Sequence, residues 1–270
     1  MFDISASIVL YQNNSEELIR TIHSFLNTKM NVKLFLVDNS PTDRLKSIIT
    51  DSRVEYLFIN KNIGFGAAHN RILKNINNKS YYHLILNPDI YFNEGVLEGL
   101  FSFMIKNGDI GLVMPKICFP NGENQFLCKL LPNPIDLIFR KFFFSKKITE
   151  KLTRKYQLYD ADYTKQMDVP SLSGCFMLVR SSVLNKVGCF DERFFMYCED
   201  LDFSRRINAT FRTVYYPNVT VYHEFHRDSY NNKKLLLVHI CSAVKYFNKW
   251  GWFIDRQRNN VNKDTLSKLF

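Results

Sequence analysis

Apolar runs recur along most of the chain, and stretches with helical periodicity separate the early ones. The runs lie at 4–11, 32–40, 54–60, 81–87, 110–117, 174–180 and 211–223. Helical spacing follows at 15–26, with Ser15 as the expected N-cap, and at 94–107, with Asn93 as the N-cap and Gly108 as the end. Alternating strands and helices form right-handed βαβ units. The sequence therefore predicts an α/β fold with a mostly parallel central sheet and helices on both faces.

The run at 81–87 stops abruptly at Asn87-Pro88-Asp89. A short apolar run that a turn signal bounds is typical of a strand buried on both faces. Pro88 has no N–H for the next ladder position, so the strand must end before it. We therefore expect the carboxylate of Asp89 at the carboxyl end of a central strand, where open α/β sheets bind their ligands.

The second run is followed by Asp38 and Asn39, within the stretch VDNSPTD. A carboxylate at this place can accept hydrogen bonds from a nucleobase or a ribose. The same residues also form an ordinary turn, because Asp, Asn, Ser and Pro all favour turns. The stretch does not decide between a ligand contact and a turn.

The third run leads into NKNIGFGAAHN at 60–70, which opens a helix. Gly64 and Gly66 permit close approach of the backbone to a ligand, and the free N–H groups of a helix start attract an anion. The spacing of the glycines fits neither a Walker loop nor a dinucleotide fingerprint. The loop alone does not identify its ligand.

The stretch 171–207 holds most of the remaining chemistry. A turn of small residues at Ser173 and Gly174 precedes a strand, and Phe195 and Tyr197 belong to a later aromatic run. Acidic residues stand around that run: Asp191, Glu192, Glu199, Asp200 and Asp202. Acidic side chains are rarely buried without partners, so this cluster indicates a site.

If Glu199 and Asp200 open a helix, its dipole stabilises their anionic forms, while their like charges favour protonation of one of them. A carboxylate in this setting can act as a general base for a hydroxyl group. The alternative is that the acids only cap a helix, with Arg205 and Arg206 as their partners, and for Asp202 both interpretations stay open.

The last apolar run ends at His223, and His226 lies beyond it. A lone histidine is more often structural than a ligand. If it were paired in space with Asp89, His223 could complete a site for a hard cation.

Composition narrows the class of protein. Hydrophobic residues make up 46% of the 270 residues, and the net charge of +10 attracts phosphate groups of a nucleotide, a nucleic acid or an anionic lipid. The six cysteines form no C-x-x-C pair and several lie in apolar runs, which favours reduced thiols in the cytosol. The N-terminus does not resemble a signal peptide, and no window reaches about 18 uninterrupted apolar residues. We therefore expect that the chain neither crosses nor spans a membrane.

Two basic, aromatic segments stand apart from the strand–helix pattern, at 134–156 and 235–258. Either segment could form an amphipathic helix at an anionic lipid surface. Either could equally be a core-facing helix with a solvated basic face.

The stretches LILNPDI, SGCFMLVR and FDERFFMYCEDLDFSRR resemble the family 2 inverting glycosyltransferases of the GT-A fold. More narrowly, they are similar to bacterial rhamnosyltransferases that build O-antigen, a part of lipopolysaccharide, or other cell-envelope polysaccharides. The resemblance covers roughly residues 4–228. It implies a GT-A domain with a Rossmann-like sheet at 1–228, whose nucleotide-sugar half spans about 1–118 and whose acceptor half spans about 119–228. A C-terminal helical segment at 229–270, which could associate with a membrane, would follow.

The resemblance also implies roles for single residues. The nucleotide-sugar contacts would be Tyr11, Asp38, Asn39, Asn62, Gly64, Gly66, Asn70, Asn87 and Asp89. The acceptor contacts would be Ser173, Gly174, Phe195 and Tyr197. Asp89 and His223 would hold a divalent cation, Mg²⁺ or Mn²⁺, while Asp200 would be the catalytic base with Glu199 as its supporting neighbour. Asn87 stands where the family's Asp-x-Asp motif has its first aspartate, which leaves the strictness of metal dependence open.

The implied reaction is transfer of L-rhamnose from dTDP-L-rhamnose to a polyprenyl-diphosphate-linked saccharide. It would take place in the cytoplasm, on a peripheral protein at the inner, anionic face of the cytoplasmic membrane. A UDP-hexose donor is the alternative within the family. A nucleotidyltransferase would show a glycine-rich, basic loop after the first strand, where this chain has the acidic LYQNNSEEL. A nucleic-acid-binding module is compatible with the charge, but no recognition motif supports it, and we expect no nucleic-acid partner.

Overall fold

The computed structural model describes residues 1–139, 145–224 and 233–270. The strands are β1 (Phe2–Leu10), β2 (Val32–Asp38), β3 (Val54–Phe58), β4 (Ser80–Leu86), β5 (Ile90–Tyr91), β6 (Ile110–Cys118), β7 (Met167–Asp168), β8 (Phe176–Arg180) and β9 (Arg212–His223). The helices are α1 (Ser15–Leu26), α2 (Phe65–Leu73), α3 (Val96–Lys106), α5 (Lys146–Tyr156), α6 (Leu184–Val187), α7 (Glu199–Asn208), α9 (Lys233–Trp250) and α10 (Arg256–Leu269). Short helical turns are η1 (Arg44–Ile48), η2 (Ile135–Phe139) and η3 (Ser181–Val183). Every apolar run of the sequence forms a strand.

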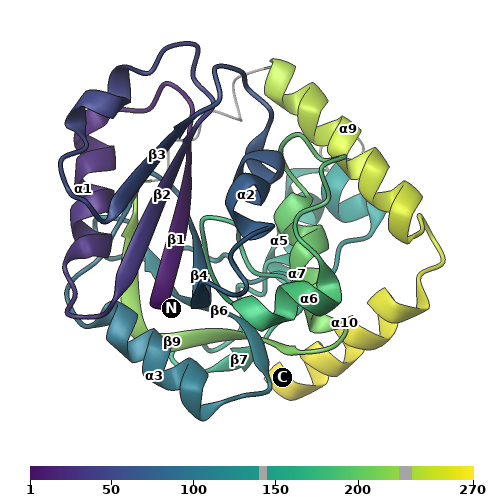
Figure 1. Cartoon of the computed structure of the whole chain (residues 1–270). Coiled ribbons are helices and arrows are strands. Elements are labelled where there is room, and N and C mark those ends of the chain that lie inside the picture. The colour runs from purple at the N-terminus through teal and green to yellow at the C-terminus, as the bar shows by residue number, and fades with distance from the viewer. Residues whose placement is uncertain (140–144, 225–232) are drawn as a thin grey trace.

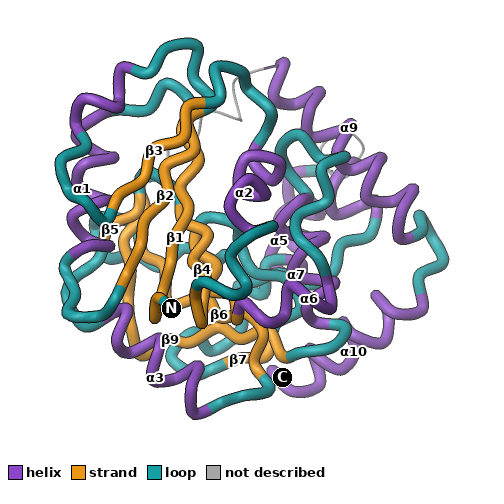
Figure 2. Tube along the Cα trace, viewed as in Figure 1, coloured by secondary structure: helices purple, strands orange, loops and turns teal. Residues whose placement is uncertain are grey.

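The described strands form a single mixed sheet in the order β3-β2-β1-β4-β8-β6-β9-β5, and β7 pairs with β9 (Figure 2). Strands β3, β2, β1 and β4 are parallel neighbours, and β6 is parallel to β9. Strand β8 is antiparallel to both of its neighbours, as β5 and β7 are to β9. Most strands thus share one direction, and α1 and α2 lie on opposite sides of β1 to β3 (Figure 1). The expected α/β fold is confirmed.

Two helix starts differ from the expectation. The N-cap of α1 is Asn14, one residue before Ser15, because its side-chain oxygen accepts the N–H groups of Glu16 and Glu17. Helix α3 begins after Gly95, which is left-handed at φ 91°, and Asn93 caps nothing. A glycine takes this conformation at little cost, so the backbone rather than a side chain sets the start of α3.

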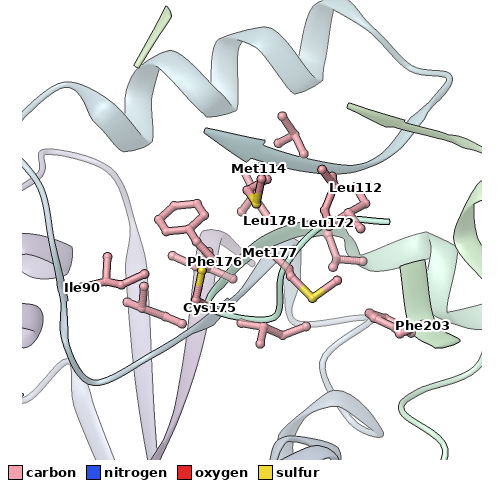
Figure 3. Close-up of a cluster of buried hydrophobic side chains, with 14 of the residues drawn as sticks. Ile90, Leu112, Met114, Leu172, Cys175, Phe176, Met177, Leu178 and Phe203 are labelled. Atoms are coloured by element: carbon pink, nitrogen blue, oxygen red, sulfur yellow. The ribbon is translucent and has the colours of Figure 1, made fainter. Parts of the chain in front are cut away.

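The hydrophobic core continues directly beneath the carboxyl edge of the sheet. One cluster contains Ile90 of β5, Cys175 and Phe176 at the start of β8, and Phe203 of α7, as Figure 3 shows. Burial of these side chains ties together three elements that lie far apart in the sequence. The same cluster therefore fixes the positions of the residues that flank it.

The C-terminal helices pack against α7. Arg205 of α7 is buried and forms an ion pair with the buried Asp255 at 2.8 Å, and its guanidinium lies over the ring of Trp250. Asp202 of α7 accepts hydrogen bonds from Trp250 and pairs with Lys249 at 2.6 Å. Buried charges need such partners, so α9 and α10 complete the surroundings of α7.

Some expectations fall outside the part of the chain that the structure describes: His226, residues 140–144 of the first basic segment, and the boundary between 228 and 229. The six cysteines are free thiols, as expected. Among the described helices, none is both long and apolar enough to cross a bilayer.

Candidate functional site

Most of the candidate residues gather at one edge of the sheet. Asp38 ends β2, Asp89 follows β4, and His223 ends β9, where it pairs with Ile90. Because β8 runs antiparallel to β4, its beginning lies at this edge too, and the N–H of Asn87 donates to the carbonyl of Cys175 at 2.9 Å. The antiparallel strand thereby brings the turn before β8 to the carboxyl ends of the parallel strands.

Asp89 and His223 meet as expected. The Nε2 atom of His223 lies 3.4 Å from Oδ2 of Asp89, and both side chains are largely buried. Gln125 fixes the ring, because its side-chain amide donates to the His223 carbonyl and its Oε1 lies 2.9 Å from Nδ1. Nδ1 therefore carries the proton that is donated to Gln125, and Nε2 is the nitrogen that faces the carboxylate.

This pair suits a hard cation as a partial site. The Oδ1 atom of Asp89 is buried and has no hydrogen-bond partner among the described residues. Within those residues no group of three or more His, Cys, Asp or Glu side chains could hold a metal. Mg²⁺ commonly takes one or two protein ligands and fills its other positions with water and substrate phosphates. The donor set thus fits a cation that is completed by a diphosphate.

Asp38 is fully buried, and its carboxylate already has internal partners. It accepts the N–H of Ser40 at 2.8 Å and the hydroxyl of Tyr56 at 2.5 Å. Burial and the neighbouring Asp38 carboxylate raise the pKa of Tyr56. Asn39 donates to the carbonyl of Gly64 at 3.2 Å, and its buried Oδ1 lacks a partner among the described residues. Nucleotide contact by Asp38 and Asn39 stays a prediction.

The glycines of the 60–70 loop serve a close approach within the protein. Gly64 has φ +91°, and a Cβ atom there would lie 2.3 Å from the carbonyl oxygen of Phe195. That oxygen accepts the N–H of Phe65, and the N–H of Gly64 donates to the side chain of Asn62. A Cβ on Gly66 would lie 2.9 Å from that of Phe190. The loop is thus packed against residues 190–195.

Asn70 holds the same segment from the helix side. Its side-chain NH₂ donates to the carbonyl of Phe190 and to Glu192, both at 2.9 Å, and its oxygen accepts the N–H of Phe190. Tyr11, in contrast, presents a half-exposed ring at the sheet edge. For Asn62, Gly64, Gly66, Asn70 and Tyr11 a nucleotide contact stays a prediction.

Asp200 lies at the start of α7, as the sequence predicts. Its Oδ2 accepts the N–H of Gly174 at 3.0 Å and its Oδ1 accepts the N–H of Leu201 at 2.8 Å. The two residues just before α7, Tyr197 and Cys198, have left-handed φ angles of 69° and 65°. Left-handed backbone at successive non-glycine residues costs free energy and is typical of functional turns. The turn brings the Asp200 carboxylate against the Ser173–Gly174 turn.

Glu199 differs from its neighbour. Its side chain is buried, and its Oε2 lacks a hydrogen-bond partner among the described residues. Burial raises the pKa of its carboxyl group well above the usual range, and the charge of Asp200 adds to that shift. Both effects favour the protonated, uncharged form of the Glu199 carboxyl group.

Asp202 is a structural acid. It pairs with Arg206 at 2.8 Å as well as with Lys249 and is fully buried. Arg205 binds Asp255 and is no partner of the acids at 199–202. The contacts of Asp202 thus agree with the structural alternative, with Arg206 as its partner.

Cys175 connects the two sides of the site. Burial raises the pKa of its thiol to about 12, and the carboxylates of Asp89 and Asp200 act in the same direction. Both carboxylates thus lie close enough to influence one sulfur atom. Ser173, half-buried beside them, accepts the N–H of Cys175 at 3.4 Å.

A small cavity of about 150 Å³ opens beside Asp200. Its lining residues are Lys129, Leu137, Tyr156, Ser171, Tyr197, Cys198, Glu199, Asp200, Leu201 and His239. Of the expected acceptor contacts it includes Tyr197, whereas Phe195 lies against Gly64. Lys129, His239 and Gln125 were not found from the sequence, because no motif or periodicity marks them.

A larger cavity of about 570 Å³ lies elsewhere, between α1 and the segments 48–54 and 92–94. It contains none of the candidate residues, and its Arg53 is paired with Asp51. We therefore place the acceptor side of the site at the smaller cavity, which Glu199 and Asp200 line.

The sequence of this chain is similar to those of known glycosyltransferases. The family model for glycosyl transferase family 2 matches residues 5–188, more than half of the chain. The N-acetylglucosaminyl-diphospho-decaprenol L-rhamnosyltransferase of Mycobacterium tuberculosis is 26% identical over 83% of this chain and 76% of its own. Rhamnosyltransferase WbbL of Escherichia coli K12 is 24% identical over 97% of this chain and 98% of its own.

Solved structures are similar at the level of the fold. S. aureus TarS (residues 1–349) has a TM-score of 0.59 at 17% identity, covering 98% of this chain and 70% of its own. GalNAc-T7, solved with UDP, GalNAc and Mn²⁺, has a TM-score of 0.61 at 14% identity, covering 83% of this chain and 43% of its own. The GT-A fold is confirmed, and the chain belongs to glycosyl transferase family 2.

Proposed function

We propose that the protein is an inverting rhamnosyltransferase that moves L-rhamnose from dTDP-L-rhamnose to a lipid-linked saccharide of O-antigen or another cell-envelope polysaccharide. The observation that carries this proposal is that Asp89 and Asp200, which come from distant segments, both lie near Cys175. A donor diphosphate and an acceptor hydroxyl each need one such group. The names of two relatives, both rhamnosyltransferases, support the sugar.

On the donor side, Asp89 and His223 would hold Mg²⁺ or Mn²⁺. When bound, the cation would neutralise the negative charge that grows on the departing diphosphate. Gln125 keeps Nε2 of His223 turned toward the cation position. The edge residues Tyr11, Asp38, Asn39 and Asn87 would contact the nucleotide.

On the acceptor side, Asp200 would take the proton of the attacking hydroxyl group. The hydroxyl oxygen forms a bond to the anomeric carbon while the bond from that carbon to the diphosphate oxygen breaks, which inverts the configuration. The proton ends on Asp200. Burial raises the pKa of Glu199, which disfavours a second negative charge beside the incoming oxygen.

The nucleotide of the donor is less firmly supported than the reaction. dTDP and UDP differ by the methyl group of thymine, which a pocket discriminates only weakly, and by the 2′-hydroxyl of UDP, which a site discriminates strongly only if it hydrogen-bonds that hydroxyl. A UDP-hexose is the alternative, favoured by the UDP in the related GalNAc-T7 structure and by a hexosyltransferase among the relatives. Family membership gives no support to a nucleotidyltransferase or a nucleic-acid-binding module.

A panel of nucleotide sugars tests the donor. We expect dTDP-L-rhamnose with Mg²⁺ to raise the Tm most and to be the donor that is consumed in single turnover. If a UDP-hexose raises the Tm more than dTDP-L-rhamnose does and its hexose is transferred, that hexose would replace rhamnose in this proposal. Protection by no nucleotide sugar, with or without the cation, would contradict it altogether.

We also propose that the protein works in the cytoplasm, bound peripherally to the anionic inner face of the cytoplasmic membrane. Helix α9 packs one face inward, where Ala243, Tyr246 and Phe247 are buried. The turn between α9 and α10 leaves Phe253 75% and Ile254 87% exposed, close to the exposed Arg256. Exposed aromatic and aliphatic side chains beside cations suit an anionic lipid surface.

Phosphatidylglycerol vesicles test the membrane proposal. The protein should sediment with them at low salt and be released at high salt, because salt screens the attraction. A variant with Phe253→Asp and Ile254→Asp should lose most of the binding, while Ile105→Asp, at an exposed position of α3, should keep it. Equal binding by all three proteins would contradict a role for this turn.

A further inference from the structure

Lys129 is a half-buried cation in the cavity of the proposed base. It lines the cavity together with Asp200 and His239. Its backbone is pinned, since its N–H donates to the Ser171 carbonyl at 2.9 Å and the next residue, Leu130, donates to the carbonyl of Tyr156. The lysine is therefore held at the cavity by structure on both sides.

The ammonium group and the base act on the same atoms. The positive charge of Lys129 lowers the pKa of the Cys175 and Cys198 thiols, against the larger effect of burial, while Asp200 raises both. Despite this proximity, Lys129 forms no ion pair or hydrogen bond through its side chain with any described residue. A partly dehydrated cation without an anion is unfavourable, so the cavity favours an anionic ligand.

The cavity is small and open to solvent. With a volume of about 150 Å³ it can receive a phosphate group or part of a sugar ring while the rest of the substrate lies outside. Two phosphate sources exist under the proposed function: the diphosphate of the donor and the diphosphate that links the acceptor sugar to its lipid.

The position of Lys129 favours the acceptor. The donor diphosphate has its own partners at Asp89 and His223, whereas Lys129 shares its cavity with the base and with His239 of α9. A hydroxyl on the acceptor ring must face Asp200, and the phosphate of the same substrate is attached to that ring. We propose that Lys129 binds the phosphate next to the acceptor sugar, so that the enzyme selects phosphate-linked saccharides over neutral glycosides.

This inference rests on the proposed function, and acceptor binding tests it directly. The probes are N-acetylglucosamine linked through a diphosphate to farnesol, and the same sugar linked to farnesol without phosphate, each titrated in the presence of dTDP. The wild type should bind the diphosphate probe more tightly. Lys129→Met should lower the affinity for the diphosphate probe by roughly 10- to 100-fold, the usual effect of losing a hydrogen bond to a charged group. The affinity for the neutral probe should not change. Lys129→Arg should keep most of the preference.

Lys263→Met is the matched control, because it removes the same charge from an exposed position on α10. Equal weakening of both probes, or a loss of dTDP affinity instead, would overturn the assignment of Lys129 to the acceptor. No preference of the wild type for phosphate would overturn it whether or not the variants fold. A clear phosphate preference without transfer from any donor would refute the proposed reaction and leave the phosphate site standing.

Discussion

His223 faces Asp89 across 3.4 Å because Gln125 holds the opposite nitrogen of its ring. The three residues come from segments more than thirty positions apart, and the strand pair β5 and β9 brings two of them together. An imidazole nitrogen and a carboxylate that face each other, with one carboxylate oxygen unpartnered among the described residues, suit a cation beside them. The relationship leads to two predictions about cations.

Asp89→Asn should abolish transfer with little change in the free energy of unfolding. The carboxylate makes no hydrogen bond that the core requires, and the Asp89 carbonyl still accepts the N–H of Glu224. Activity assays and thermal unfolding measure the two effects separately. Unchanged activity in the variant, or in the wild type with excess chelator, would count against a cation.

Gln125→Ala should weaken Mn²⁺ binding by about 10- to 100-fold, the usual effect of removing the residue that orients a metal-binding histidine. Isothermal titration in the presence of the nucleoside diphosphate measures this. Asn121→Ala, a polar loop residue of the same segment that is exposed, is the control. Equal Mn²⁺ affinities in all three proteins would show that Gln125 does not position His223 for a metal.

Asp200→Asn should lower kcat by about 10²- to 10⁴-fold if chemistry limits turnover, while donor affinity stays near that of the wild type. Glu199→Gln is the matched control: because burial and the charge of Asp200 favour the neutral form of Glu199, an amide of the same shape should lower kcat less than Asp200→Asn does. Single-turnover transfer and titration with the nucleoside diphosphate give both quantities. A larger decrease in kcat for Glu199→Gln than for Asp200→Asn would make Glu199 the base and Asp200 its supporting neighbour.

Gly64→Ala should destabilise the protein more than Gly95→Ala. Both glycines have φ +91°, so both variants carry the cost of a left-handed alanine, about 1–2 kcal/mol. Only at Gly64 does the new Cβ also meet a backbone oxygen, that of Phe195, whereas nothing lies within 4 Å at Gly95. Urea unfolding compares the two. Equal decreases in the free energy of unfolding would mean that residues 190–198 shift at little cost to make room for the new Cβ.

Acid should destabilise the fold through two buried histidines. The ring of His83 is hydrogen-bonded to the hydroxyl groups of Ser5 and Ser7, and the ring of His69 is hydrogen-bonded to the hydroxyl of Ser7. Burial lowers the pKa of His83 from 6.5 to about 3 and also lowers that of His69, so both are neutral when folded. The unfolded chain takes up these protons as the pH falls below about 6.5, so the stability is complete above that pH and is lost toward pH 3, by roughly 1.4 kcal/mol per pH unit for each group.

Urea unfolding at several pH values between 7 and 4 measures this slope, that is, how steeply the free energy of unfolding falls with pH. His83→Gln, which keeps a donor and an acceptor, should flatten it by about half, whereas His23→Gln, on the exposed side of α1, should not. Glu199 acts in the opposite direction, since its raised pKa favours the folded state at low pH. A wild-type slope that His83→Gln leaves unchanged would assign the acid sensitivity to other groups.

The positions of the strands, and of the acids that follow them, could be predicted from the sequence. Apolar runs and a proline mark Asp89, and an acidic pair after an aromatic run marks Asp200. Each of these signals is local: the side-chain types and their spacing express the same constraint that the fold imposes.

Contacts between distant segments could not be predicted. Nothing in the local sequence of Gln125 or Lys129 indicates a neighbour such as His223 or Asp200, because both lie in an irregular stretch after β6. Gly64 and Asn70 were recognised as special, yet the structure shows them packed on residues 190–195. Local patterns reveal that a residue is constrained, and only the tertiary arrangement reveals what constrains it.

The ion pair between Arg205 and Asp255 sets a limit on how far the enzyme can be trimmed. A fragment that ended before α9 would contain every residue that the family model covers, yet it would leave the buried guanidinium of Arg205 in α7 without Asp255, and Asp202 without Lys249 and Trp250. Helix α7 begins with the proposed base, so loss of its partners would disturb the start as well as the middle of that helix. A fragment that keeps α7 formed should therefore extend at least through Asp255. The family model thus covers fewer residues than this chain needs to keep the helix that carries the proposed base.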